Sequence, residues 1–283
     1  MTIKDYRSFF INELTPIYDP LEAENFFSLL LEEYHSMKRV DLALAPEKEF
    51  TADEVTNWNA ILDQLKKEIP IQYIIGSTHF CGFKFEVNPD VLIPRPETEE
   101  LVEWVFSSHK NSFPQPQILD IGTGSGCIAI ALALKFDNAN VSALDVSVKA
   151  LETARRNAQL NNVKINFVQR NILESDKIDG NFHLLVSNPP YVRMLEKDHI
   201  KNNVLENEPH LALFVEDEDA LIFYRKISKL AMDSLVKGGW LYFEINQYLP
   251  EETESLLKNQ GFINVELKKD IYENFRMIRC QKL

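Results

Sequence analysis

Residues 118–126, ILDIGTGSG, decide the fold class of this chain. The apolar residues up to Ile121 predict a buried strand, three alternating glycines follow, and an apolar helix is predicted from Cys127 to Leu134. Glycines let a backbone approach a ligand and let the next helix pack closely. The spacing Gly-x-Gly-x-Gly differs from that of dinucleotide sites, and the loop contains no lysine of a phosphate-binding P-loop.

A second predicted strand, residues 141–145, ends in Asp145, which lies 19 residues after Gly126. A carboxylate at this place can accept hydrogen bonds from both hydroxyls of a ribose. Together with the glycine loop it fits S-adenosylmethionine, whose adenosine carries no phosphate. Asp120 either lies near the cationic methionine end of this cofactor or caps the loop.

After a third predicted strand, residues 164–169, the chain continues with Asn171-Ile172-Leu173. This is the place where an adenine would rest in such a sheet. Either Ile172 or Leu173 could flank the ring, and an ordinary core aliphatic explains the same residues equally well.

Residues 184–191, LLVSNPPY, predict a fourth buried strand that stops at two prolines. Proline cannot donate a ladder hydrogen bond and restricts the residue before it, so Asn188 and Tyr191 are held on a stiff loop. The Asn188 side-chain oxygen and the Pro189 carbonyl are two fixed acceptors for the hydrogens of a planar NH2 group. With Tyr191 on the face of that group, the loop suits methylation of an amide or amine nitrogen. A rigid turn with a buried aromatic is the alternative.

Strands and helices alternate from residue 117 onward, which predicts an α/β fold with a doubly wound parallel sheet. Further strands are expected near 182–187, 239–245, 262–268 and 275–281, and the last two are close enough in sequence to be antiparallel. The polar stretch 192–218 is expected to be a long loop beside the site, either a lid or a disordered insertion.

The preceding residues predict two further segments. Residues 1–70 form a small helical domain, with Asp19-Pro20 and the capping box at Thr51 marking helix starts. Residues 71–95 form a β-hairpin linker that includes a strand at 72–76, and residues 96–283 form the α/β domain, opening with a helix from about Glu97 to His109.

Composition limits the function classes. The net charge is −13, and residues 1–70 hold 7 Lys and Arg against 14 Asp and Glu, which disfavours direct nucleic-acid binding. There is no apolar run long enough for a membrane span and no signal-peptide pattern at the start. Three scattered cysteines and six histidines without ligand spacing predict no metal site and a reducing cytoplasm.

The chain resembles a known family at five places, over most of residues 70–191 and more weakly afterwards. The matching stretches are QYI-x-G at 72–76, F-x-G-x-x-F at 80–85, LIPRPETE at 92–99, the loop motif at 120–130 and SNPPY at 187–191. They resemble the release-factor glutamine N5-methyltransferases, the HemK or PrmC family. Residues 1–70 resemble the N-terminal domain of this family only in their helical character.

The resemblance implies a seven-stranded class I S-adenosylmethionine-dependent methyltransferase domain with a small N-terminal helical recognition domain joined by a β-hairpin. It implies methylation of the glutamine in the Gly-Gly-Gln motif of class 1 peptide chain release factors by a cytoplasmic enzyme, which we expect to be a monomer. The residues implied to bind the cofactor are Gly122, Thr123, Gly124, Ser125, Gly126, Asp145, Ile172 and Asn188. The residues implied to hold the glutamine or to act in catalysis are Asn188, Pro189, Pro190 and Tyr191.

The sequence departs from the family pattern at three places. A Gly-Gly-x-Asp-Gly-Leu stretch is replaced by residues 214–221, the usual Glu-Ile-Gly is Glu244-Ile245-Asn246, and a glycine expected after Asp270 is absent. These differences concern the rim of the site.

Three other functions fit parts of the pattern. A nucleic-acid amino-methyltransferase also uses Asn-Pro-Pro-Tyr but predicts a basic groove, which the charge disfavours. A ribosomal-protein glutamine methyltransferase usually lacks the Pro-Glu-Thr-Glu found at 96–99. A non-catalytic binding module of this fold would tolerate loss of Asn188 or of the glycines, which are intact.

Overall fold

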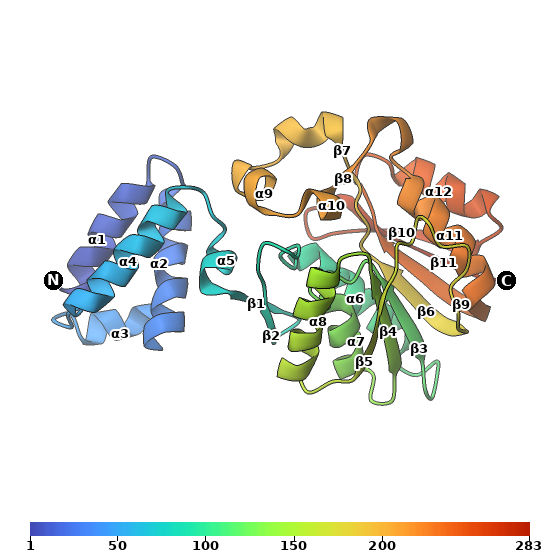
Figure 1. The fold of residues 1–283 in the computed structure, drawn as a ribbon, viewed down its shortest axis with the longest axis horizontal. Helices are drawn as coiled ribbons and strands as arrows, with labels where there is room; N and C mark the ends of the chain where they lie inside the picture. Colours follow the sequence, from blue (N-terminus) through green and yellow to red (C-terminus); the bar gives the residue numbers. More distant parts are fainter. The chain divides into compact units, whose positions relative to one another are not determined.

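The computed structural model describes residues 1–283, apart from the side chain of His199. The chain divides into two compact units. The first comprises Met1–Gly76 with Asn202–Asn207, and the second comprises Ser77–Lys201 with Glu208–Leu283. Figure 1 shows that the first unit is helical and that the second contains the sheets.

The helical unit is built around a buried aromatic cluster. Its helices are α1 (Ile3–Leu14), α2 (Pro20–His35), α3 (Arg39–Leu44), α4 (Ala52–Leu65), α5 (Ile71–Ile75) and α9 (Asn202–Asn207). Trp58 of α4 packs against Phe10, Phe27 and Phe50, with ring centroids 4.9 to 5.9 Å apart. The predicted helix starts are confirmed, because Asp19 and Thr51 both accept backbone hydrogen bonds as N-caps.

The predicted strand at 72–76 is wrong, because residues Ile71–Ile75 form the short helix α5. Ile71, Ile74 and Ile75 have the i, i+3, i+4 spacing of one helix face, and all three pack into the core of the helical unit. Gly76, with φ 79°, caps the carboxyl end of this helix.

The hairpin itself lies further along the chain than predicted. Its strands are β1 (Ser77–Phe80) and β2 (Phe83–Glu86), and Phe80 pairs with Phe83 across the turn. Cys81 and Gly82 form the two-residue turn with φ 51° and 82°, the left-handed pair that matches the twist of a hairpin.

A seven-stranded sheet forms the centre of the second unit, in the order β10-β11-β9-β6-β3-β4-β5. Its strands are β3 (Gln117–Ile121), β4 (Asn140–Asp145), β5 (Ile165–Gln169), β6 (Phe182–Ser187), β9 (Leu235–Glu244), β10 (Ile263–Lys269) and β11 (Phe275–Gln281). The five from β5 to β9 are parallel, and β11 is antiparallel to both β9 and β10. The predicted strand positions and the antiparallel last pair are confirmed.

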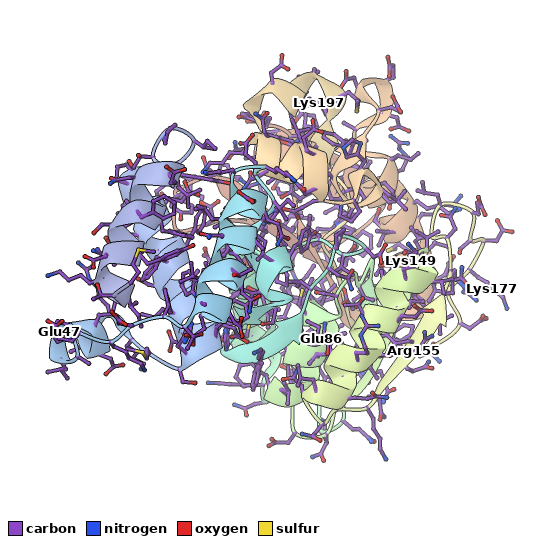
Figure 2. All side chains as sticks on the ribbon, turned by 60° about the vertical axis from the view of Figure 1, so that its left-hand side comes forward. Glu47, Glu86, Lys149, Arg155, Lys177 and Lys197 are labelled. Atoms are coloured by element: carbon purple, nitrogen blue, oxygen red, sulfur yellow. The ribbon has the colours of Figure 1, made fainter. Side chains whose placement is uncertain are left out.

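Helices cover both faces of this sheet (Figure 1). They are α6 (Pro96–His109), α7 (Cys127–Lys135) and α8 (Val148–Leu160) on one face, and α11 (Ile222–Ser234) and α12 (Pro250–Asn259) on the other. Successive strand residues face opposite layers, so Leu184 packs with α6 and α7 while Leu185 packs with α11. The outer side of α8 carries the exposed Lys149 and Arg155 (Figure 2).

The segment 192–218, predicted to be an irregular loop, is instead folded into short elements. Besides α9 these are β7 (Val192–Arg193), η1 (Met194–His199), α10 (His210–Leu213), β8 (Phe214–Val215) and η2 (Asp217–Asp219), of which η1 and η2 are 3₁₀ helices. Parallel pairing of β7 with β8 joins the two ends of the part that belongs to the second unit.

Gly126 provides a test of this packing. A Cβ at Gly126, where φ is 83°, would lie 3.0 Å from Ile130 Cδ1 and 3.1 Å from Ala154 Cβ, whereas one at Gly82, with φ 82°, would meet nothing within 4 Å. Both Gly→Ala variants incur the left-handed backbone penalty of about 1–2 kcal/mol. We expect Gly126→Ala to lose about 1–3 kcal/mol more in urea unfolding because α7 and α8 must separate. Equal losses in the two variants would contradict the tight packing.

Candidate functional site

Two loops meet where the order of the sheet reverses. Strand β3 lies between β4 and β6, and Ile121 at its end pairs with Ser187 at the end of β6. The Ser187 hydroxyl donates a hydrogen bond of 2.6 Å to the Ile121 carbonyl. Ligands of open α/β sheets bind at this kind of switch point, beyond the carboxyl ends of the strands. The glycine loop and the Asn-Pro-Pro-Tyr loop therefore begin side by side.

The first two glycines of the loop face open space. Gly122 and Gly124 have φ 76° and 54°, and a Cβ on either would meet nothing within 4 Å. The amides of Gly122 and Thr123 both donate to the Leu144 carbonyl at 2.9 Å, which holds the loop against β4. The backbone of Gly122 and Gly124 therefore borders a cavity, and no side chain of these two residues fills it.

That cavity has a volume of about 250 Å³. Its walls come from the carboxyl ends of β3, β4 and β6, from the segment before α6, and from residues 209–212. The lining residues include Leu92, Gly122, Gly124, Leu144, Asp145, Ala150, Ile172, Leu173, Asn188, Pro189, Pro190, Pro209 and Phe223.

Asp145 is an acidic residue of the cavity wall, beside the glycine loop. One carboxylate oxygen accepts from the Gly124 amide at 2.8 Å and the other from the Ser147 amide at 2.9 Å. Each carboxylate oxygen has a second lone pair, so both can still accept a hydroxyl. Burial raises the pKa of Asp145, while the amides that it accepts lower it. The geometry fits the two hydroxyls of a ribose.

The wall beside Asp145 is apolar. Both Ile172 and Leu173 line the cavity, together with Leu144, Ala150 and Phe223. Ile172 and Leu173, the two residues that the sequence offered as neighbours of an adenine ring, therefore both belong to this wall. Such a surface suits a flat aromatic ring, and with Asp145 and the bare glycines it fits an adenosine.

Three residues of the glycine loop do not line the cavity. Thr123 and Ser125 are buried, and Asn157 donates to the Ser125 carbonyl at 2.9 Å. The Thr123 hydroxyl donates to Asp120 at 2.6 Å, and Gly126 packs against α8. These residues shape the loop, because their contacts are with Asp120, Asn157 and α8 and not with the cavity.

Asp120 caps the glycine loop and does not line the cavity. Its carboxylate is fully buried and also accepts from the Ala129 amide at 3.2 Å, which ties the loop to the start of α7. Its second oxygen has no hydrogen-bond partner among the described residues. Burial raises the pKa of Asp120 to about 7, against the opposing effect of Thr123 and Ala129.

The Asn-Pro-Pro-Tyr loop borders two cavities. Asn188, Pro189 and Pro190 line the cavity beside the glycines. Asn188 and Tyr191 also line a second cavity of about 60 Å³, together with Arg95 and Glu244. Asn188 is thus common to both, whereas Tyr191 belongs only to the smaller one.

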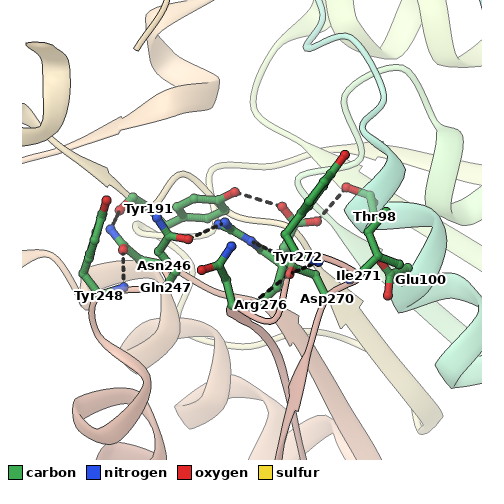
Figure 3. Close-up of polar contacts among 12 residues, drawn as sticks. Thr98, Glu100, Tyr191, Asn246, Gln247, Tyr248, Asp270, Ile271, Tyr272 and Arg276 are labelled. Atoms are coloured by element: carbon green, nitrogen blue, oxygen red, sulfur yellow. Dashed lines mark hydrogen bonds and ion pairs between the residues drawn. The ribbon is translucent and has the colours of Figure 1, made fainter. Parts of the chain in front are cut away.

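A buried carboxylate anchors the smaller cavity. Glu244, at the end of β9, accepts from the Tyr191 hydroxyl at 2.9 Å and from the Thr98 hydroxyl at 2.6 Å (Figure 3). Thr98 in turn accepts from the Asn188 side-chain amide at 3.2 Å. Burial raises the pKa of Glu244, and burial followed by the nearby Glu244 raises that of Tyr191. Tyr191 therefore keeps its proton and remains a donor.

The sequence patterns did not assign roles to Thr98 and Glu244. Thr98 lies in the quoted stretch 92–99, but its partner is 146 residues away. Glu244 had one usable signal, because it is an acid at the carboxyl end of a strand adjacent to β6. The same rule that singled out Asp145 also applies to it.

A second buried acid holds the wall of the larger cavity. Glu208 forms an ion pair with Arg95 and accepts from the Ile93 amide at 3.2 Å. Leu92 and Pro209, next in sequence to this contact, both line the larger cavity. The stretch before α6 and the stretch before α10 are therefore fastened together where they enclose it.

Comparison with known proteins identifies the family. The model "Methyltransferase small domain" matches residues 101–214, and "PrmC N-terminal domain" matches residues 12–76. The release factor glutamine methyltransferase of Flavobacterium psychrophilum is 55% identical over 281 residues, which are 99% of each chain. The chain belongs to the release factor glutamine methyltransferases. The release factor glutamine methyltransferase of Bacteroides thetaiotaomicron is 38% identical over 270 residues, which are 95% of this chain and 96% of the relative's chain.

Solved structures agree on the fold. A methyltransferase from Pyrococcus furiosus superposes with a TM-score of 0.55 at 21% identity, covering 77% of this chain and 98% of that one. The fold is therefore the class I S-adenosylmethionine-dependent methyltransferase fold, with the helical PrmC N-terminal region preceding it.

Asn246 is one of the departures from the family pattern, and its side chain makes several hydrogen bonds in the structure. Asn246, where the family usually has glycine, donates from its side-chain amide to the Tyr191 carbonyl and to Glu196 at 2.9 Å each. Its oxygen accepts from the Tyr248 amide (Figure 3). The extra side chain thus ties the loop after β6 to the segment that contains η1.

Two features are absent from the described residues. None of their helices combines the length and the apolar composition that a membrane span requires. They contain no group of three or more His, Cys, Asp or Glu side chains placed to hold a metal ion.

Asp120 predicts an unusual dependence of stability on pH. Its pKa is about 7 in the folded chain against an ordinary value of 3.8, so the folded state holds the extra proton between these values. The free energy of unfolding should therefore fall as the pH rises from about 4 to 7, by up to roughly 4 kcal/mol.

Urea unfolding of wild type and Asp120→Asn at pH 5 and pH 8 measures this effect. The advantage of wild type over Asp120→Asn should shrink at pH 8, and Asp137→Asn, which alters an exposed carboxylate, should show no such change. A pH-independent difference for Asp120→Asn would exclude a raised pKa.

Proposed function

We propose that the protein transfers a methyl group from S-adenosylmethionine to the side-chain amide nitrogen of the glutamine in the Gly-Gly-Gln motif of class 1 peptide release factors. The observation that carries the proposal is the position of Asn188. It lines both the cavity beside the glycine loop and the small cavity at Tyr191. Methyl transfer requires donor and acceptor sites that meet, and Asn188 is the polar residue among the three, with Leu92 and Ala212, that line both cavities.

Specific residues would hold the cofactor. Gly122 and Gly124 leave space for it, Asp145 accepts the ribose hydroxyls, and Ile172 and Leu173 flank the adenine. Thr123, Ser125 and Gly126 support the loop from within and are not proposed as direct contacts. When bound, S-adenosylmethionine supplies an electrophilic methyl group on a sulfonium.

The acceptor nitrogen must be oriented before it can attack. An amide nitrogen is a poor nucleophile because its lone pair is delocalised into the carbonyl. The Asn188 oxygen and the Pro189 carbonyl would each accept one N–H of the glutamine, which directs the remaining lone pair toward the larger cavity. Both acceptors also stabilise the positive charge that grows on the nitrogen.

Tyr191 would support the plane of the glutamine amide. Its hydroxyl is fixed by Glu244 at 2.9 Å and its carbonyl by Asn246. The ring therefore has little freedom to leave the small cavity. The nitrogen forms its bond to carbon before it loses a proton, so no strong general base is required at this position.

The helical unit is the proposed recognition domain. It matches the PrmC N-terminal domain over residues 12–76, and residues 1–70 carry 14 acidic against 7 basic side chains. An acidic surface favours a basic protein partner over a nucleic acid. We expect the enzyme to act as a monomer on a folded release factor.

The first experiment measures transfer of labelled methyl from S-adenosylmethionine to a purified class 1 release factor. The control is the same factor with the glutamine of its Gly-Gly-Gln motif replaced by alanine. We expect label on the first protein and none on the second. Label on both would place the acceptor elsewhere, and label on neither, with cofactor binding intact, would favour a ribosomal-protein or nucleic-acid acceptor.

Asn188→Ala tests the mechanism. Removing one of two amide acceptors should reduce turnover about 10²-fold or more and leave cofactor binding nearly unchanged, because the acceptor acts mainly in the transition state. Single-turnover methylation and calorimetry measure the two effects, and Asn138→Ala, at an exposed asparagine, is the control. Turnover close to wild type would refute the role of Asn188.

Asp145→Ala tests the cofactor site. Loss of a charged acceptor for the ribose should raise the dissociation constant for S-adenosylmethionine about 10–100-fold. Asp145→Asn keeps one oxygen and should have a smaller effect, and Asp137→Ala controls for charge. Unchanged affinity by calorimetry in Asp145→Ala would reject the ribose assignment.

A further inference from the structure

The side chain of Asn188 is held by a relay of hydrogen bonds from two other elements, α6 and β9. Its Nδ2 donates to Thr98 Oγ1 of α6 at 3.2 Å, and Thr98 Oγ1 donates to Glu244 Oε2 of β9 at 2.6 Å. Thr98 and Glu244 are 2% exposed each, so water does not compete for these groups. Figure 3 shows Thr98 and Tyr191 pointing toward one another from opposite sides.

The direction of this relay follows from the chemistry of its members. An ionised carboxylate can only accept, and a threonine hydroxyl has a single proton. Because that proton is committed to Glu244, the Thr98 oxygen can only accept from its next neighbour. Thr98 must therefore meet the NH2 end of the Asn188 amide.

The two ends of an asparagine amide have nearly the same shape, so packing alone does not choose between them. With its NH2 end on Thr98, Asn188 leaves its oxygen for a substrate. In the opposite orientation Asn188 would present N–H groups to the N–H groups of a glutamine, and donor would face donor. The choice of orientation therefore decides whether the loop can hold the amide acceptor at all.

We propose that Thr98 and Glu244 are positioning residues that fix the orientation of the Asn188 side chain and so make its oxygen available to the acceptor amide. This inference rests on the proposed function and adds two residues to it, which act through their hydrogen bonds to Asn188 and Tyr191. Glu244 has a second task, because its other oxygen holds the Tyr191 hydroxyl.

Three groups face the Glu244 carboxylate besides Tyr191. Thr98 and Glu97 belong to α6, and Arg276 belongs to β11, where it also contacts Asp270 and Gln247. The hydroxyl donors and Arg276 favour the ionised form that the relay needs, whereas burial and Glu97 oppose it. Protonation of Glu244 would let it donate to Thr98 and would reverse the relay.

Thr98→Val and Thr98→Ser are the first pair of variants. Valine keeps the shape of threonine and removes the hydroxyl, so we expect the turnover number to fall about 10-fold or more, with KM for the release factor and affinity for S-adenosylmethionine within about twofold of wild type. Serine keeps the hydroxyl and should restore most of the turnover. Thr253→Val, at a buried threonine of α12 whose hydroxyl donates to the Leu249 carbonyl, controls for the loss of a buried hydrogen bond.

Glu244→Gln is the second test and provides a pH signature. Glutamine can donate to Thr98, so the relay loses its fixed direction and turnover should fall about 10-fold or more. In wild type, turnover should decline as the pH falls through the raised pKa of Glu244, and this acidic limb should be absent in Glu244→Gln. Persistence of the same limb in the variant would assign it to another group and overturn the role of Glu244.

A double variant separates the relay from general damage to the site. If Thr98 acts through Asn188, the variant with both Thr98→Val and Asn188→Ala should be no slower in single turnover than Asn188→Ala alone. Additive losses would show that Thr98 has a separate role. Wild-type turnover in Thr98→Val, with Asn188→Ala inactive, would overturn the relay alone, whereas a wild-type enzyme that never labels the release factor would overturn the proposed function.

Discussion

Parallel pairing of β3 with β6 is the constraint on which the site depends. It joins two segments that are distant in sequence and sets Ile121 beside Ser187, so the glycine loop and the Asn-Pro-Pro-Tyr loop leave the sheet at the same edge. The Ser187 hydroxyl closes this junction with a buried bond to the Ile121 carbonyl. The meeting of the two loops follows from this one register, because a shift of one residue would turn the side chains of either strand to the opposite face.

Buried carboxylates perform the positioning around this junction. Asp120 fixes the glycine loop to α7, Glu208 joins the two stretches that enclose the larger cavity, and Glu244 receives the hydroxyls of Thr98 and Tyr191. A buried carboxylate is costly unless its oxygens are satisfied. In return it gives direction, because a carboxylate in its ionised form only accepts hydrogen bonds and therefore dictates which end of each neighbouring group it meets. The acids thus order a site whose proposed chemistry itself calls for no strong base.

The sequence predicted the elements of the sheet well because its central strands are buried on both faces and appear as short apolar runs, as in β3 and β6. The edge strands β5 and β10 are half-buried or exposed, and they were predicted from the alternation of strand and helix patterns along the chain. Local patterns also located the helix caps at Asp19 and Thr51. The pattern at 72–76 misled because a five-residue segment satisfies helical and strand periodicity together, and packing of Ile71, Ile74 and Ile75 decided the outcome.

The candidate site was predictable only where its residues directly follow a predicted strand. Gly122, Gly124, Asp145 and the loop 188–191 follow strands directly, and the structure brings them together at one edge. Thr123 and Ser125 belong to the same motif, but only the folded loop reveals that they face inward. Thr98 and Glu244 form their bonds across 90 and 146 residues, and no local pattern encodes such a contact.

The position of β11 has a consequence for folding. This strand, residues 275–281, lies between β9 and β10 and pairs with both. The edges of β9 and β10 that face β11 therefore have no partner until this strand has inserted between them. An open apolar strand edge invites pairing with other chains. Insertion of β11 is thus the step that closes this side of the sheet, and rapid insertion would protect the folding chain from such pairing.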